Sequence, residues 1–195
     1  MIPVFFIYGL AFFIIGLAIV IYPKKDSEFK LAKNLLLIAG FGIIHGISEW
    51  VDMFKLINKD PGLANFLNLL GLPMLVVSFL FLVQFGVVTV IEKKKKFSVL
   101  KFLPVSLFVI WLGASILNKH QFFLIGGILG RYLFGIPGIV LTAYGLFLKI
   151  PELETKHLKK LGNHLRLAAL GFLCYAFFSG IITPKADFFP ASVLN

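Results

Sequence analysis

Charged residues are scarce in this chain of 195 residues: they make up 14% of the sequence, whereas about a quarter of a soluble domain is charged. Apolar residues make up 59%, and the mean hydropathy is +0.96. A globule of this size has too small an interior to hide that much apolar surface from water. The composition therefore excludes a soluble globular protein and predicts that lipid covers much of the chain.

Cysteine and the common catalytic motifs are also nearly or wholly missing. Cys174 is the one cysteine, and it stands in an apolar stretch, so the sequence has no disulfide framework. No nucleophilic serine of the GxSxG kind, no HExxH motif and no Walker loop occurs. We therefore do not expect this chain to be an enzyme.

Six apolar stretches reach the roughly 20 residues that a helix needs to cross a bilayer. They are residues 3–22, 31–57, 63–91, 97–117, 121–148 and 165–183. The first lacks a basic leader and a small-residue cleavage site, so we interpret it as a retained helix. A membrane barrel would show alternating polarity, which is absent. The sequence predicts one all-α integral membrane domain over residues 1–195, a six-helix bundle, with a broken or re-entrant fifth stretch as the alternative.

The basic residues predict the orientation of this bundle. Of 19 basic residues, 14 lie in or beside the breaks that follow the first, third and fifth stretches. Lys55, Lys59, Lys119 and Lys185 lie on the opposite side. By the positive-inside rule, those three breaks are cytoplasmic, both termini face outward, and the protein is a multi-pass protein of the cytoplasmic (inner) membrane. The net charge of +10 is therefore a topology signal, and we expect no nucleic-acid partner.

Residues 150–164 form the longest polar break. Leucines recur in it at near-helical spacing with lysines between them. This pattern is typical of an amphipathic helix that lies on the inner leaflet and is attracted to anionic lipid. A solvated linker is the alternative.

Ionisable residues inside a span are costly and mark functional sites by default. In the second stretch His45, Glu49 and Asp52 are four and then three positions apart, so they fall within roughly 60° of one another around a helix. Gly42 and Gly46 lie on the same side and form a small-xxx-small pair that permits close helix approach. This face is predicted to point into the bundle.

Arg131 in the fifth stretch is the matching cation. Its predicted depth overlaps with that of Glu49 and Asp52, and Gly127 and Gly138 lie close to it around the helix. We therefore predict that the second and fifth spans pack together. Arg131 would pair with Glu49, and Asp52 is a second candidate partner.

This cluster has several chemical interpretations. It would form a ligand- or proton-sensing pocket, with Trp50 and Tyr132 as further lining residues, or a purely structural bridge. The set His45, Glu49 and Asp52 is a metal-site alternative, which the nearby Arg131 charge opposes. Haem is a further alternative, but the other histidines, His120, His157 and His164, lie near the membrane surfaces. No cofactor is implied.

Three segments resemble the N-terminal membrane region of bacterial sensor histidine kinases, and related regions precede diguanylate cyclases. They are HGISEWVDMF (45–54), GRYLFGIPGIVLTAYGL (130–146) and LRLAALGFLCYAFFSGIITPKADFFPASVLN (165–195). The matching positions are His45, Glu49, Trp50, Asp52, Arg131, Tyr132, Gly135, Pro137, Gly138, Arg166, Phe188, Phe189, Pro190 and Asn195.

The resemblance implies a signal-receiving bundle that passes its state to a cytoplasmic transmitter. The sequence contains no ATP-binding glycine boxes and no phosphoacceptor helix, so the transmitter is not part of it. In such kinases one more span would lead back to the cytoplasm. We expect either an excised sensor domain, which the end at a segment boundary favours, or a stand-alone homologue that acts through a partner.

The expected function is therefore a membrane-embedded sensing domain for a small molecule, protons or the state of the membrane. Its expected partners are the lipid bilayer, a cytoplasmic kinase or similar transmitter and an unidentified small ligand, and a homodimer is left open. Protonation or ligand binding would change the attraction between Arg131 and the carboxylates and shift the second and fifth spans. The alternatives are a transporter or channel for small solutes and a membrane redox protein that binds haem or quinone.

Overall fold

The computed structural model describes residues 2–21, 30–181, 183–184, 186–187, 189 and 191–193, without the side chains of residues 30, 32 and 179–181. Within these ranges all regular structure is helical, which confirms the all-α prediction. The α-helices are α1 (Ile2–Ile21), α2 (Lys30–Ile57), α3 (Pro61–Lys93), α4 (Leu103–Leu117), α5 (Phe122–Gly130), α6 (Ile136–Thr155) and α7 (Lys159–Tyr175). Two 3₁₀ segments, η1 (Lys95–Phe102) and η2 (Lys119–Gln121), and two π-helical segments, η3 (Arg131–Gly135) and η4 (Ala176–Ile181), complete the helical structure.

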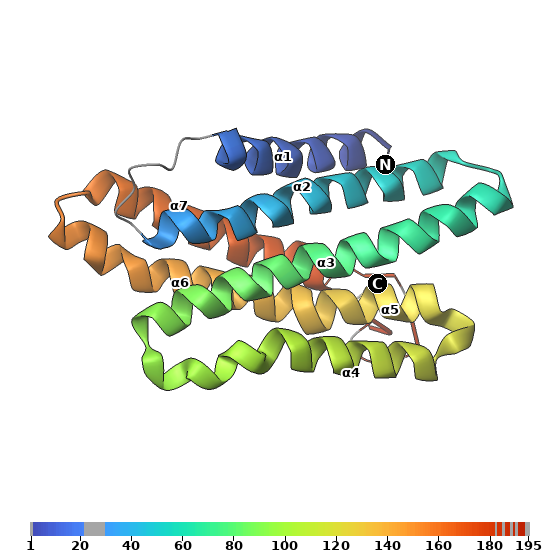
Figure 1. Ribbon diagram of the computed structural model, residues 1–195. Helices are drawn as coiled ribbons and strands as arrows, with labels where there is room; N and C mark the ends of the chain where they lie inside the picture. The colour runs from blue at the N-terminus through green and yellow to red at the C-terminus, as the bar shows by residue number, and fades with distance from the viewer. Residues whose placement is uncertain are drawn as a thin grey trace.

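The six predicted spans correspond one to one to helices. In the described part of the chain, six helices are long and apolar enough to cross a membrane: α1, α2, α3, η1 with α4, η2 through α6, and α7 with the start of η4. The fifth of these continues through η3 without turning back, so the re-entrant alternative is wrong (Figure 1). The chain is therefore an all-helical, multi-pass membrane protein.

The helices run alternately up and down the bundle (Figure 1). The ends of α1, α3 and α6 and the beginnings of α2, η1 and α7 lie at one end, which we call the Lys-rich end because lysines 93–96 and 159–160 lie there. The turns from α2 to α3 and from α4 to α5 lie at the opposite end. This alternation places the helix ends that flank the three predicted cytoplasmic connections at the same end of the molecule.

Helix α3 is the centre of the bundle. It packs against α2 on one side and against α5, η3 and α6 on the other, while α1 packs on α2 and α7 packs on α6. The expected direct packing of the second and fifth spans is therefore not observed, because α3 separates them. The physical reason is that α3 is apolar around most of its circumference and can be buried on every side. Gly138 and Gly145 of α6 lie directly against Val83 and Thr89 of α3.

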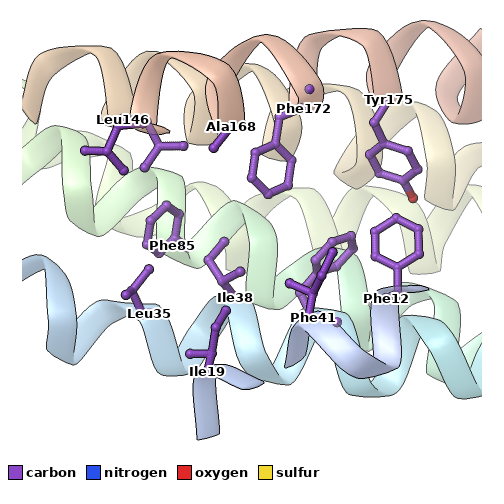
Figure 2. Close-up of a pocket in the computed structure, with 14 residues that line it drawn as sticks. Phe12, Ile19, Leu35, Ile38, Phe41, Phe85, Leu146, Ala168, Phe172 and Tyr175 are labelled. Carbon is purple, nitrogen blue, oxygen red and sulfur yellow. The ribbon is translucent and has the colours of Figure 1, made fainter. Parts of the chain in front are cut away.

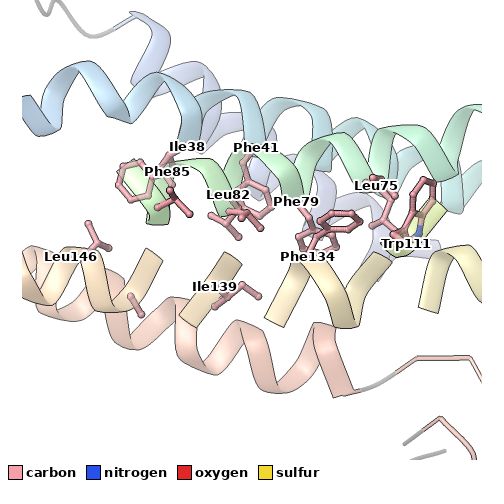
Figure 3. Close-up of a cluster of buried hydrophobic side chains, with 14 of the residues drawn as sticks. Ile38, Phe41, Leu75, Phe79, Leu82, Phe85, Trp111, Phe134, Ile139 and Leu146 are labelled. Carbon is pink, nitrogen blue, oxygen red and sulfur yellow. The ribbon is translucent and has the colours of Figure 1, made fainter. Parts of the chain in front are cut away.

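A single cluster of buried apolar side chains joins α2, α3 and the fifth span (Figure 3). Phe41, Phe79, Leu82, Phe134 and Ile139 lie at its middle, and each is at most 1% exposed. By contrast, most side chains of α1, α4 and α7 remain half-buried or exposed although they are apolar. In a membrane protein lipid covers such surfaces, so these three helices form the lipid-facing rim of the bundle.

Glycines bring α1 and α2 unusually close. A Cβ atom at Gly46 would lie 2.5 Å from the Gly9 carbonyl oxygen, and one at Gly42 would lie 2.7 Å from the Phe12 carbonyl oxygen. The notched face of α2 thus receives α1 and not the fifth span. The reason is that α1 carries its own notch, Gly9 and Gly16, at the matching depth.

Residues 150–164 do not form a separate surface helix. Residues 150–155 are the last turns of α6, a turn follows in which His157 adopts φ 59°, and α7 begins at Lys159. Ion pairs hold this extension against its neighbours, since Lys93 binds Glu152 at 2.5 Å and Arg166 binds Glu154 at 2.5 Å. These contacts explain why α6 continues straight instead of turning onto the membrane surface.

We predict that Gly46→Ile will destabilise the bundle, because the new side chain would meet the backbone of α1 and push that helix outward. Overpacking of this kind costs about 1–3 kcal/mol. Thermal unfolding of the purified protein in detergent, followed by circular dichroism, measures the effect. Gly113→Ile is the matched control, since a Cβ at Gly113 has nothing within 4 Å. Equal losses of stability in both variants would contradict the packing described here.

Candidate functional site

His45 is the most deeply buried ionisable side chain of the predicted site, with 2% exposure. The rings of Phe12, Phe41 and Phe79 surround it, with centroids 4.9, 5.1 and 5.2 Å from the imidazole centroid. A polar ring in such a place is costly unless both nitrogens have hydrogen-bond partners. The residues that bind the two ring nitrogens of His45 are therefore important for the packing of the helices around it.

Both imidazole nitrogens are engaged by hydroxyl groups from other spans. Nδ1 lies 3.1 Å from Ser78 Oγ on α3, and Nε2 lies 2.7 Å from the Tyr175 hydroxyl at the end of α7. Ser78 donates its own proton to the Leu75 carbonyl oxygen at 2.7 Å, so Nδ1 must be the donor toward Ser78. A neutral imidazole then accepts at Nε2, and Tyr175 is the donor to it.

Tyr8 of α1 adjoins this arrangement, because its ring lies against the ring of Tyr175 with 6.4 Å between the centroids. Tyr8, Tyr175, His45 and Ser78 thus form a connected set, which we call the polar chain. It crosses from α1 through α7 and α2 to α3. The backbone of α7 packs mainly on α6, so Tyr175 is the residue through which the last span meets α1 and α2 by hydrogen bonding.

Glu49 lies beside the polar chain. Its Oε1 is 3.4 Å from His45 Nε2, and the residue is 6% exposed. The positive charge of Arg131 attracts Glu49 electrostatically, but within the described residues Arg131 makes no ion pair with either predicted carboxylate. Asp52 pairs instead with Lys55 at 2.8 Å. The predicted bridge is therefore not formed, because α3 separates the two spans and Lys55, one turn along α2, reaches Asp52 first.

Arg131 and Asp52 nevertheless face the same cavity, which we call the polar pocket. It has a volume of about 380 Å³ and lies toward the end of the bundle opposite the Lys-rich end. Its polar lining comes from Asp52, Lys55, Asn68 and Arg131, and its apolar lining comes mainly from α3 and α5. A pocket of this size with separated charges of both signs can hold a small ionic or zwitterionic molecule.

A second cavity lies on the Lys-rich side of Tyr175, and we call it the apolar slot. It has a volume of about 410 Å³ and lies between the α1–α2 pair and α7, with walls from α3 and α6. Figure 2 shows Phe12, Phe41 and Tyr175 gathered at one end of this cavity and Leu35 and Leu146 at the other. Among its described lining residues Tyr175 alone has a polar side chain.

Other predicted site residues have structural contacts. Trp50 donates from Nε1 to the Phe6 carbonyl oxygen at 3.2 Å and docks α1, and the Tyr132 hydroxyl lies 2.9 Å from Thr183 Oγ1. Gly127 lines the polar pocket, and a Cβ there would have nothing within 4 Å.

The positions that matched the kinase segments are spread over the bundle. Gly135 packs on Phe79, Arg166 pairs with Glu154 and Phe189 is 79% exposed. Phe188, Pro190 and Asn195 lie outside the described residues.

Both π-helical segments adjoin the site. Arg131 begins η3, Tyr175 directly precedes η4, and the two segments pack against each other. A π-turn inserts one extra residue into a helix and is frequent at functional sites. One π-helical segment therefore begins at Arg131, and the other begins directly after Tyr175.

The metal alternative is not supported by this geometry. In the described part of the chain, no three His, Cys, Asp or Glu side chains are grouped closely enough to hold a metal ion. Asp52 pairs with Lys55 and does not join His45 and Glu49. An axial haem ligand needs a free imidazole lone pair, but Nε2 of His45 accepts from Tyr175 and Nδ1 donates to Ser78.

Three residues of the polar chain, Tyr8, Ser78 and Tyr175, were not among the residues predicted from the sequence. Their hydroxyl groups stand in long apolar runs, where serine and tyrosine are common without any special role. The available signal is indirect: a histidine inside a span needs two partners, and hydroxyl groups at its depth in other spans are the candidates.

We predict that Tyr175→Phe will destabilise the protein by about 1–3 kcal/mol, because it leaves His45 Nε2 buried without a partner. In the double variant with His45→Phe the loss should be smaller than the sum of the single losses, since both polar groups are then gone. Thermal unfolding in detergent measures this cycle. Tyr144→Phe is the control, because its exposed hydroxyl contacts Lys94 at the surface. Additive losses would show that the Tyr175–His45 bond contributes nothing.

Comparison with known proteins does not assign this chain to a family. No family model matches the chain, and no curated protein or solved structure matches it. The resemblance to sensor-kinase membrane regions therefore stays a prediction, and the function has to be argued from the polar chain and the two cavities.

Proposed function

We propose that this chain is a membrane-embedded sensing domain, which relays a small-molecule or proton signal to a cytoplasmic transmitter such as a histidine kinase. The observation that carries the proposal is the position of Tyr175. Its hydroxyl group links the last span to the polar chain, and Glu49 beside that chain is three positions along α2 from Asp52, which lines the polar pocket. A signal at the pocket thus has a short physical route to α7.

The switch that we propose is a competition for one acceptor. Neutral His45 offers a single lone pair, at Nε2, and Tyr175 occupies it. Ionised Glu49 has no proton to donate, but its acid form has an O–H group, and its Oε1 lies only 3.4 Å from Nε2. Protonation of Glu49 therefore creates a second donor for the same lone pair and releases Tyr175.

The polar pocket connects a ligand to this competition. Arg131 lines the pocket and attracts the Glu49 carboxylate electrostatically. An anionic group that binds Arg131 in the pocket partly neutralises its charge and so weakens the attraction between Arg131 and Glu49. Protons and an anionic ligand therefore act on the same carboxyl group, and both change how firmly Tyr175 is held.

Tyr175 is well placed to transmit the change. It ends α7 and is followed by the π-helical η4, and α7 begins at the Lys-rich end. Once the Tyr175–His45 bond is broken, α7 is held by its packing on α6. A tilt of α7 about that contact moves its first turns at the Lys-rich end, where a cytoplasmic transmitter would detect it.

The cavities favour a sensor over a transporter. A transporter for polar solutes needs a polar route through the whole bundle. The polar pocket has charged walls, but the cavity on the Lys-rich side of Tyr175 is lined by apolar side chains. A polar solute that entered the pocket would therefore find no polar path beyond His45 along this line.

The proposed location is the cytoplasmic membrane, with the Lys-rich end in the cytoplasm. In a Cys174→Ala background, Asn118→Cys should react with a membrane-impermeant maleimide on intact bacterial cells, whereas Lys95→Cys should react only after lysis. Both positions are at helix ends of the bundle. Labelling of Lys95→Cys on intact cells with protection of Asn118→Cys would reverse the proposed orientation.

The switch predicts opposite behaviour for two uncharged replacements of Glu49. Glu49→Gln keeps a permanent N–H donor beside Nε2 and should hold the bundle in the released state at every pH. Glu49→Met has no donor and should hold it in the Tyr175-bound state. In wild-type protein the distance between the Lys-rich ends of α1 and α7 should change on acidification.

Pulsed electron paramagnetic resonance in nanodiscs measures that distance, with spin labels on Val20→Cys and Leu161→Cys in a Cys174→Ala background. Both labelled positions are exposed, at 50% and 44%. Identical distance distributions for Glu49→Gln and Glu49→Met would show that competition for Nε2 is not the switch. A wild-type distance that is independent of pH and of added small anions would remove the support for sensing.

A further inference from the structure

The apolar slot has the dimensions of one leaflet of the bilayer. Its wall on α7 runs from Leu165 to Tyr175, a rise of about 15 Å along a helix. The hydrocarbon core of a bilayer is about 30 Å thick, so a single leaflet contributes roughly 15 Å. The slot therefore begins near the Lys-rich surface of the membrane and ends at the depth of Tyr175 and Phe12 (Figure 2).

Small residues create the empty space. Ala168 and Gly171 face the slot from α7, and a Cβ atom at Gly171 would have nothing within 4 Å. The opposite wall is formed by Ile38 and Phe41 of α2 and by Phe85 of α3. Larger side chains in place of Ala168 and Gly171 would occupy part of the space between α7 and the α1–α2 pair.

The residues that line the apolar slot determine which kind of molecule can bind in it. The slot walls are hydrocarbon and aromatic carbon, apart from the Tyr175 hydroxyl, which is bound to His45. Cavities lined in this way stay dry and can bind apolar molecules, so an occupant of the slot has to be apolar. A polar head group finds no place inside and has to stay at the mouth of the slot.

The end of the slot that Leu35 and Leu165 line lies toward the Lys-rich end, and we call it the mouth of the slot. Basic side chains near it offer a partner for such a head group. Lys33, two positions before the slot residue Leu35 on α2, is exposed, and Lys160 and His164 precede Leu165 on α7 and are exposed as well. A molecule with an apolar chain of leaflet length and an anionic head fits both the slot and its mouth. Phospholipids of the surrounding bilayer have this form.

We propose that the apolar slot is a binding site for one acyl chain of an anionic phospholipid from the leaflet at the Lys-rich end. The chain enters between α1 and α7, its head group stays near Lys33, and its methyl end lies against Phe12 and Tyr175. This site is separate from the polar pocket, and the proposal does not rest on the proposed sensing function.

The experiment uses the whole chain in nanodiscs that contain phosphatidylglycerol with a photoactivatable diazirine near the methyl end of one acyl chain. After illumination, mass spectrometry locates the labelled residues. We expect labelling of Phe12 and Phe172 inside the slot, in addition to labelling of lipid-facing residues such as Leu167, which is 70% exposed. Moving the diazirine next to the head group should shift the slot labelling to Leu35 and Leu165.

Gly171→Leu fills the slot without meeting any atom within 4 Å of its Cβ, and it should abolish labelling of Phe12 and Phe172 while Leu167 stays labelled. Gly113→Leu is the control, since it adds the same side chain to open space on α4 and should leave all labelling unchanged. Ala168→Leu blocks the same slot if Gly171→Leu does not fold.

Three outcomes would overturn the proposal. Wild-type labelling confined to lipid-facing residues would show an empty or collapsed slot. Slot labelling that persists in both blocking variants would show that the chain reaches Phe12 and Phe172 from elsewhere. Equal labelling with a photoactivatable phosphatidylcholine of the same chain would show that the anionic head group is not recognised. None of these outcomes bears on the Glu49 switch.

Discussion

The absence of water from the bilayer interior is the constraint on which the rest of this structure depends. A polar atom in that region has to find its partner within the protein. His45 has one on each ring nitrogen, Ser78 on α3 and Tyr175 on α7, and the ring of Tyr8 on α1 lies against Tyr175. Apolar helices can slide and rotate against each other at little cost, but a hydrogen bond of 2.7 Å between two spans fixes their depth and their rotation. The polar chain thus helps to fix the depth and the rotation of four helices relative to one another.

The membrane class and the six spans could be predicted from the sequence, because they follow from composition and length alone. The order of the helices could not. Helix α3 is apolar on nearly all sides, and a helix without a polar face gives no indication of which side is buried. Its central place depends on close approaches such as Gly138 against Val83, which are visible once the partner helix is known. The same difficulty affected Gly42 and Gly46, whose notch was predicted but was matched to the fifth span and not to α1.

For the site, the sequence placed His45 and Glu49 correctly on one interior face but misjudged the pairing of charges. By depth, Arg131 is predicted to pair with Glu49, and Asp52 is the second candidate. Lys55, however, is three residues from Asp52 on the same helix and forms the ion pair with it at 2.8 Å. A lysine three positions away on the same helix is close to the aspartate whatever the tertiary packing. Lys55 therefore forms the ion pair with Asp52 in place of the more distant Arg131. The Tyr175 hydroxyl, which holds the site together, carries no such signal, because a tyrosine in an apolar span is unremarkable until its partner is known.

The two proposals have a common consequence, because both involve the hydrogen bond between Tyr175 and His45. In the proposed switch the polar pocket would act through Arg131 on Glu49, which would compete for His45 Nε2, and the apolar slot ends against Tyr175, which occupies that nitrogen. If a signal in the pocket releases Tyr175, the ring at the closed end of the slot moves, and the fit of the acyl chain changes. Binding free energies are reciprocal, so the lipid must then change the affinity of the pocket for its ligand by the same factor. Such a bundle would respond to a ligand differently in membranes of different lipid composition. The hydrogen bond between the Tyr175 hydroxyl and the His45 imidazole would couple the two sites.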